Sequence, residues 1–192
     1  MRRYAPAAAC VLALAAAGGA QAAVTVFGGG MAQACSAAAR DGVTDPAAEQ
    51  ACTAALEGEL MPARDRAGTY VNRGIIKLRR KEYAAAIADF DNAIKTKADL
   101  AEGYVNRGAA YIGARRFMES VVDFNSALQL GVPEPHKAYY NRGVAYQWLD
   151  DPAAAYLDYQ KALELAPDWN LPKAQLARLG FGASVAPPAP KR

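Results

Sequence analysis

The residues able to do acid–base chemistry are few, and the aspartates among them recur at a fixed spacing. His136 is the single histidine of the chain. Asp89, Asp123 and Asp158 stand 34 and then 35 residues apart, and paired carboxylates are what a glycoside hydrolase uses as acid and base. Residues that recur once per repeat, however, usually serve the geometry of the repeat. We therefore expect no catalytic residue, and His136 at the surface.

An arginine accompanies each aspartate, sixteen residues before it: Arg73, Arg107 and Arg142. This spacing predicts a ladder of ion pairs, one within each repeat, and an exposed pair of this kind contributes only about 0–1 kcal/mol. The sequence has no Gly-x-Ser-x-Gly motif and no cluster of metal ligands. Neither a metal nor a cofactor is expected.

The arginines and the glycines that follow them belong to a repeated pentapeptide. Tyr-Val-Asn-Arg-Gly at residues 70–74 returns at 104–108 and, as Tyr-Tyr-Asn-Arg-Gly, at 139–143. A small residue follows each glycine after twelve positions, and an aromatic residue after sixteen: Phe90, Phe124 and Tyr159. The residues before Phe90 have helical spacing, with Tyr83, Ala86, Ile87 and Phe90 on one face.

These columns resemble the tetratricopeptide repeat (TPR), whose pattern is W-x2-L-G-x2-Y…A-x3-F…P over 34 residues. Tyrosine stands in place of the tryptophan and arginine in place of the leucine, and only Pro167 keeps the closing proline in its usual place. The resemblance covers residues 67–168. It implies an all-α fold, a short α-solenoid with two-helix hairpins at 67–100, 101–135 and 136–168. In each hairpin the glycine and the small residue are expected to let the helices approach closely, and the aromatic ring to fill the space between one repeat and the next.

The N-terminal residues 1–22 have the features of a secretory signal peptide. Arg2 and Arg3 precede an apolar run at residues 7–17, and Ala20-Gln21-Ala22 offers small residues at a cleavage site. We expect cleavage after Ala22, a periplasmic or secreted protein of bacterial type, and no membrane insertion after cleavage. An uncleaved anchor is the alternative, although the run is short of the ~20 residues that a span needs.

The leader takes two of the 22 basic residues of the chain and none of its 19 acidic residues. The remainder is nearly neutral, so the sequence does not favour a nucleic acid as partner. After the leader, residues 23–30 are expected to be a flexible lead-in. The glycines at 28–30 lack the Lys-Ser/Thr that follows a phosphate-binding loop.

Additional helices are expected at both ends of the repeats. Residues 31–60 predict a degenerate helical hairpin, in which Asp45-Pro46 caps the second helix. In an oxidising compartment Cys35 and Cys52 are expected to form a disulfide that replaces the aromatic residue; two buried free thiols or a redox pair are the alternatives.

At the C-terminal end, residues 169–180 predict a capping helix that ends at Gly180. Residues 183–192, with their prolines and alanines, predict a disordered tail.

The resemblance also indicates a binding site. In the TPR family the first helix of each repeat lines a concave groove, where asparagines hold the backbone of an extended peptide. Asn72, Asn106 and Asn141 occupy this position, although asparagine also serves local helix contacts there. Ten further residues on the same helices are candidates for the groove lining: Val71, Ile75, Leu78, Val105, Ala109, Ile112, Lys137, Tyr140, Val144 and Trp148.

Such a groove is mainly apolar and differs from the carboxylate-clamp subtype of the family, so an acidic C-terminal peptide is not the expected ligand. The sequence therefore predicts a non-catalytic, exported module that binds a protein or peptide in its concave groove. The alternative is a self-associating scaffold or envelope-assembly adaptor that uses its outer faces, with which a homo-oligomer is compatible. A carbohydrate-binding protein or hydrolase is the third possibility.

Overall fold

The computed structural model describes residues 22–180. The expected leader, apart from Ala22, and the expected tail at 183–192 lie outside the described residues. Within residues 22–180 the chain forms nine helices, which are α2 (Gly30–Asp41), α3 (Pro46–Gly58), α4 (Ala63–Arg79), α5 (Tyr83–Thr96), α6 (Ala101–Gly113), α7 (Phe117–Gln129), α8 (Pro135–Trp148), α9 (Pro152–Leu165) and α10 (Asn170–Leu179).

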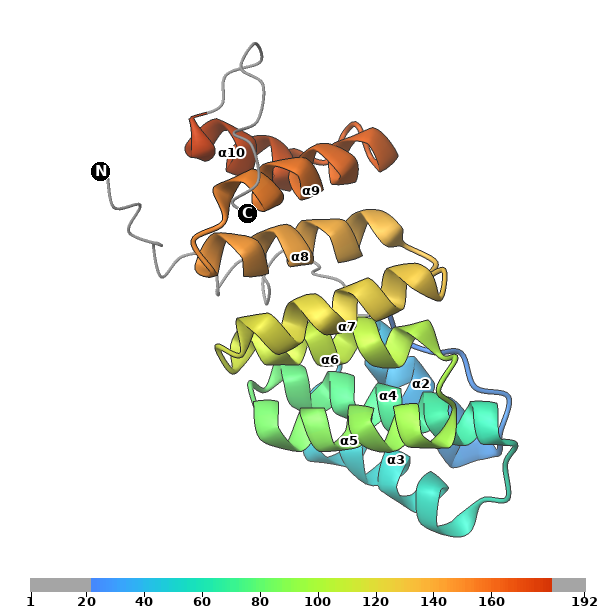
Figure 1. The fold of residues 1–192 in the computed structure, drawn as a ribbon. Helices are drawn as coiled ribbons and strands as arrows, with labels where there is room; N and C mark the ends of the chain where they lie inside the picture. Colours follow the sequence, from blue (N-terminus) through green and yellow to red (C-terminus); the bar gives the residue numbers. More distant parts are fainter. Residues whose placement is uncertain (1–21, 181–192) are drawn as a thin grey trace.

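Neighbouring helices pair as hairpins, α2 with α3, α4 with α5, α6 with α7 and α8 with α9, and each hairpin packs on the next. Figure 1 shows these hairpins stacked in chain order, with α10 covering the last one. The first helices also contact one another, α2 with α4, α4 with α6 and α6 with α8. The all-α solenoid predicted from the repeats is thus confirmed.

The three aromatic rings of the repeats are fully buried, as expected of core residues: Phe90, Phe124 and Tyr159. Each ring packs against the glycine of its own repeat, a contact within the hairpin, whereas the sequence predicted a position between repeats. A Cβ atom added to Gly74 would lie 2.5 Å from a ring carbon of Phe90, and one added to Gly143 would lie 2.8 Å from Tyr159. These glycines are required because any side chain would occupy the space of the ring.

The first hairpin has the predicted disulfide. The Cα atoms of Cys35 and Cys52 lie 4.8 Å apart, and the bond packs against Ala48 and Ile76. The side chain of Asp45 accepts a 2.8 Å hydrogen bond from the Ala48 backbone N–H, as expected of a cap at the start of α3.

At the other end of the solenoid, Leu179 of α10 joins the core of the last repeat. Gly180, with φ at 72°, ends α10 where the capping helix was expected to stop.

The segment before α2 differs from the expected flexible lead-in. Val24 and Val26 are buried, whereas Thr25 and Phe27 between and after them are exposed. Gly30 already belongs to α2. Residues 22–26 therefore form an extended segment that packs on the helices, and the reason is a set of hydrogen bonds described below.

Among residues 22–180, no helix combines the length and the apolar character that a bilayer span requires.

Candidate functional site

The predicted ion-pair ladder is present in all three repeats. Nε and Nη2 of Arg107 donate to the two carboxylate oxygens of Asp123 at 2.7 Å each. The equivalent pairs, Arg73 with Asp89 and Arg142 with Asp158, have contacts of 2.7–3.0 Å. The aspartates are buried, so these are not the exposed pairs that the sequence suggested, and removing one arginine would leave a buried carboxylate unpaired, which costs more than the loss of a surface pair.

The remaining guanidinium nitrogen, Nη1, connects each repeat to the hairpin before it. Nη1 of Arg73 donates to Thr53 at 3.0 Å, that of Arg107 to Asp91 at 2.6 Å, and that of Arg142 to the Asn125 side chain. Each acceptor follows directly after Cys52 or an aromatic residue of the column. Sequence reasoning missed this contact, although the shared position would have indicated it.

The tyrosine that begins each pentapeptide lies over the same arginine. The guanidinium carbon of Arg73 is 5.7 Å from the ring centre of Tyr70, and that of Arg142 is 5.3 Å from Tyr139. These are cation–π distances. The Tyr, Arg and Gly of the pentapeptide therefore serve packing between and within repeats.

Burial raises the pKa of Asp123 and of Asp158, because a carboxylate without hydration is penalised, and the paired arginines oppose this only in part. The pKa of Arg107 is raised because its hydrogen bond with Asp123 outweighs the burial of the guanidinium. Each aspartate is thus held by an arginine away from solvent, so the hydrolase interpretation loses its candidate acids.

His136 differs from the expected surface histidine. It is half-buried, and its ring packs edge-on against Trp169 at 5.4 Å. Its role in the fold is to join the start of α8 to the start of α10.

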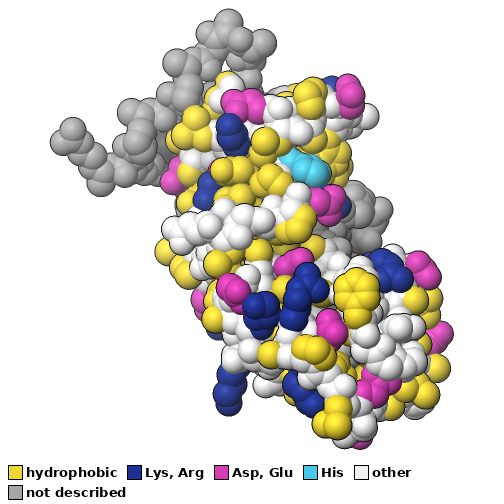
Figure 2. All heavy atoms as spheres, turned by 90° about the vertical axis from the view of Figure 1, so that its right-hand side faces the viewer, with side chains coloured by type: hydrophobic (Ala, Val, Ile, Leu, Met, Phe, Trp, Pro, Cys, Tyr) yellow, Lys and Arg dark blue, Asp and Glu magenta, His cyan; other side chains and the backbone are white. Residues whose placement is uncertain are grey.

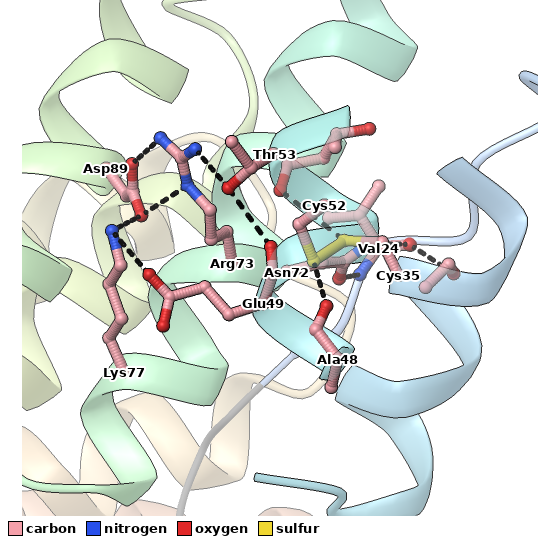
Figure 3. Close-up of a disulfide and its surroundings, with 12 residues drawn as sticks. Val24, Cys35, Ala48, Glu49, Cys52, Thr53, Asn72, Arg73, Lys77 and Asp89 are labelled. Carbon is pink, nitrogen blue, oxygen red and sulfur yellow. Dashed lines mark hydrogen bonds and ion pairs between the residues drawn. A yellow bond between two sulfur atoms is a disulfide. The ribbon is translucent and has the colours of Figure 1, made fainter. Parts of the chain in front are cut away.

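The asparagines of the pentapeptide have a different surrounding from the arginines. Both amide atoms of Asn72 bind the backbone of Val24. Its Oδ1 accepts a hydrogen bond from the Val24 N–H at 2.9 Å, and its Nδ2 donates to the Val24 carbonyl at 2.7 Å. Ser36 on α2 donates to the same carbonyl at 2.9 Å. Figure 3 shows Val24 and Asn72 close to the Cys35–Cys52 disulfide, with the Arg73–Asp89 pair beyond them.

Asn106, at the equivalent position of the next repeat, binds the same segment at Ala22, two residues before Val24. Its Nδ2 donates to the carbonyl of Ala22 at 3.2 Å and to that of Glu102 at 2.8 Å. Its Oδ1 has no hydrogen-bond partner within residues 22–180, and neither have Oδ1 and Nδ2 of Asn141, although both side chains are fully buried. Asn72, Asn106 and Asn141 together form the asparagine column. At the Asn72 end the column binds the chain's own backbone, and at the Asn141 end the amide has no hydrogen-bond partner among the described residues.

Most of the other groove candidates lie in the packed interior. Eight are buried: Val71, Ile75, Leu78, Val105, Ala109, Ile112, Tyr140 and Val144. The structure divides them between two clusters, one of which includes Val24. Lys137 pairs with Glu134 at 2.7 Å, and Trp148 stacks on Phe117 at 5.2 Å. Both remain partly exposed.

The side chain of Val24 packs against Gly68 on α4. Neither Gly68 nor Ser36 was predicted from the sequence. A Cβ atom added to Gly68 would lie 2.7 Å from Cγ1 of Val24 and 3.2 Å from a methyl group of Val26. The alternation Val24-Thr25-Val26 is the sequence signal that could have indicated an extended, half-buried segment.

An open hollow of about 420 Å³ lies where residues 22 and 23 cross the helices. Its lining has two acidic and two basic side chains, Glu102 and Glu134, Arg40 and Arg79, besides Ala22, Ala23, Ala39 and Pro133. Figure 2 likewise shows basic, acidic and hydrophobic side chains interspersed on one face of the molecule. The charges at the hollow are therefore balanced and do not select an anionic ligand.

Residues 136–168 match the tetratricopeptide repeat family. No curated protein matches the chain significantly. Solved structures share the fold. The first TPR of Spaghetti (RPAP3) bound to the HSP90 peptide SRMEEVD is 25% identical, with a TM-score of 0.59 over 61% of this chain and 92% of that chain.

Two further structures extend the comparison. The TPR domain of Arabidopsis OM64 is 26% identical, with a TM-score of 0.59 over 62% of this chain and 97% of that one. Pseudomonas aeruginosa pilF is 21% identical, with a TM-score of 0.69 over 78% of this chain and 65% of that one, and shows the fold alone. The match of residues 136–168 to the family, the stacked hairpins and these structures together show that the repeats have the tetratricopeptide repeat fold.

Proposed function

We propose that this protein is a non-catalytic, exported interaction module that binds an extended segment of a partner protein along its asparagine column. The observation that carries the proposal is the contrast along that column. Asn72 and Asn106 hold extended backbone, while the equivalent Asn141 is fully buried with both amide atoms unpaired within the described residues.

An unpaired buried amide is unfavourable by about 1–3 kcal/mol. An extended peptide satisfies it, because each residue of such a peptide presents one N–H and one carbonyl. The first TPR of Spaghetti is an example of a related fold with a bound peptide. That peptide is acidic, whereas the hollow beside Ala22 carries charges of both signs. A partner segment with little net charge suits this protein better.

Export is part of the proposal. The buried Cys35–Cys52 disulfide supports it, because disulfides persist in oxidising compartments. Cleavage after Ala22 would remove the carbonyl that Asn106 now binds, so the Nδ2 of Asn106 would be available to a partner. The intact mass of the purified protein tests this, and a chain that still begins at Met1 would contradict it.

The asparagine column is tested by Asn141→Ala. Asn141 has no hydrogen-bond partner among residues 22–180, so its replacement leaves the fold intact. Two lost hydrogen bonds to a ligand weaken binding by about tenfold, since each contributes about 0.5–1.5 kcal/mol. The measurement is quantitative capture of partners from periplasmic extract on immobilised protein.

The matched control for that capture is Asn92→Ala, which removes an exposed asparagine from α5. Equal recovery of partners by wild type, Asn92→Ala and Asn141→Ala would exclude the asparagine column as the binding site.

Self-association through the outer helices is the second candidate function. Met118 and Val122, one turn apart on α7, are 62% and 60% exposed, and Leu157 on α9 is 53% exposed. Exposed apolar side chains of this kind are what a protein interface covers. Light scattering over a dilution series tests it, since Val122→Asp should convert an oligomer to a monomer. A wild-type monomer at all concentrations would reject it.

A further inference from the structure

Residues 22–26 follow the track that the proposed function assigns to a partner. We propose that they are an internal occupant of the groove, and that the partner segment replaces them and has the same chemistry. It is extended and uncharged, with small or β-branched apolar side chains at alternate positions. This inference rests on the proposed function and specifies its ligand.

The contacts that hold the segment's backbone after cleavage come from two successive first helices. Ser36 on α2 and Asn72 on α4 bind the N–H and the carbonyl of Val24, and in the uncleaved chain Asn106 on α6 also binds the carbonyl of Ala22. All of these contacts are from side chains to main chain. They are independent of the identity of the bound residue, so a different extended chain can make them as well.

The side chains of the segment define what fits. Val24 lies over Gly68, where there is room for a methyl group only because that helix residue has no Cβ. Val26 packs into a small cluster with Ala32 and Ala55. Phe27 is 79% exposed and Thr25 is exposed as well. The groove therefore selects side chains at every second residue, as an extended ligand presents them.

The segment at residues 22–27 is also uncharged, which limits the partners that can replace it. Residues 22–27 have no ionisable side chain, in a chain of which 21% of residues are charged. Since Val24 and Val26 are buried, a charged residue at either position would be buried without a counter-ion. A partner segment is consequently uncharged at these positions.

The connection to α2 permits release. Gly28 and Gly29 join the segment to Gly30, the first residue of α2, and glycine is the residue with the widest range of backbone conformations. Because the segment is tethered, its effective concentration at the groove is high, of millimolar order for a short linker. The groove of the wild-type protein is thus largely self-occupied, which lowers its apparent affinity for any competing peptide.

The test uses the full chain and a fluorescent peptide, fluorescein-Ala-Ala-Val-Thr-Val-Phe-amide, whose residues copy 22–27. Val24→Asp releases the internal segment, because the aspartate would be buried, and leaves the groove unchanged. We expect Val24→Asp to bind the peptide at least tenfold more tightly than wild type in a fluorescence anisotropy titration. Thr25→Asp, which adds the same charge at an exposed position, should bind as wild type does.

Two controls define the site. A peptide with aspartate in place of its valine at the position of Val24 should not bind. Adding Gly68→Ala to Val24→Asp fills the space that the peptide's valine needs, and it should abolish binding, although alanine is the better helix former. If Val24→Asp keeps its helical circular dichroism and shows no gain in affinity, the segment is a permanent part of the core and the inference is wrong.

Hydrogen exchange of the wild-type protein is a second test that needs no variant. The Val24 amide, bonded to Asn72, should exchange by local release, faster than the buried amides of α6. Exchange as slow as that of α6 would overturn the inference. A wild-type dimer that Val24→Asp converts to a monomer would also overturn it, because the segment would then belong in a second copy.

The outcomes separate the two proposals. If Asn141→Ala weakens partner capture while Val24→Asp gains no peptide binding, only the internal occupant is rejected. If Val24→Asp binds the peptide while Asn141→Ala captures partners normally, the internal occupant stands and the far end of the column is not where partners bind.

Discussion

In the first hairpin Cys35 and Cys52 join α2 to α3 by a covalent bond, whereas in each repeat an aromatic ring packs against a glycine of the partner helix. The buried residues of α2 and α3 are mostly alanines besides the two cysteines. They bury less apolar surface than a phenylalanine or tyrosine would. The disulfide stabilises a hairpin whose core is too small to do so alone.

The two kinds of hairpin nevertheless share one contact. Thr53 accepts from Arg73 as Asp91 accepts from Arg107 in the next repeat. The first hairpin thus keeps the register of the repeats while it has lost their aromatic residue. It also differs in that the segment at residues 22–26 packs on it through Ser36 and Val26. A solenoid end can therefore keep the hydrogen bonds of the array and change the packing.

The largest expected effect concerns the aromatic column. Phe124→Ala should lower the free energy of unfolding by about 3–5 kcal/mol, because a fully buried ring leaves a cavity beside Gly108. Chemical denaturation measures this loss. Val122→Ala on the exposed side of the same helix is the control, and a loss for Phe124→Ala as small as that of the control would contradict the packing role.

The Cys35–Cys52 disulfide, which takes the place of the aromatic packing in the first hairpin, is tested by the double variant Cys35→Ser with Cys52→Ser. For a closed loop of this size the chain-entropy model gives a loss of about 3 kcal/mol. Hydrogen exchange should show a loss of amide protection in α2 and α3, while the amide protection in α8 and α9 stays unchanged. A reductant should destabilise wild type and leave the double variant unaffected; two reactive thiols in the untreated wild type would refute the disulfide.

The contact that both kinds of hairpin share is tested by Arg107→Ala. It leaves buried Asp123 without its partner, and we expect a loss of about 2–3 kcal/mol, between a surface pair and a fully buried one. Arg73→Ala should cost less, because Lys77 still pairs with Asp89 at 2.8 Å. Urea denaturation of the two variants compares them, and equal losses would show that Lys77 does not compensate.

The smallest effects distinguish the two ends of the asparagine column. Asn72→Ala removes both hydrogen bonds to Val24 beside the first hairpin and should cost about 1–2 kcal/mol. Asn141→Ala removes an unpaired amide and should be neutral within about 0.5 kcal/mol, or stabilising. Thermal melts of both variants measure the difference; a larger loss for Asn141→Ala would reverse the assignment of the occupied end.

Much of the fold was predictable because it repeats. The aromatic and glycine columns and the Arg–Asp pairs follow from spacing along the chain, and the Cys35–Cys52 bond follows from an even number of cysteines after the expected leader. Their burial was harder to predict. The aspartates were expected at an exposed ladder, and eight groove candidates such as Ile75 proved to be core residues. Position on a helix face indicates a neighbour, but it does not tell how completely the next hairpin covers it.

The sequence by itself determined the period of the array, the partners within each hairpin and the position of the asparagine column, because side-chain size and charge recur there in register. Only the tertiary structure decided that Val24, 48 residues before Asn72, lies on that column. The reason is that asparagine recognises main-chain N–H and carbonyl groups, which every residue but proline has in full. The alternation at Val24-Thr25-Val26 indicates an extended segment, but it does not indicate which asparagine binds the backbone, because that contact forms only when the stacked helices bring the amide to it.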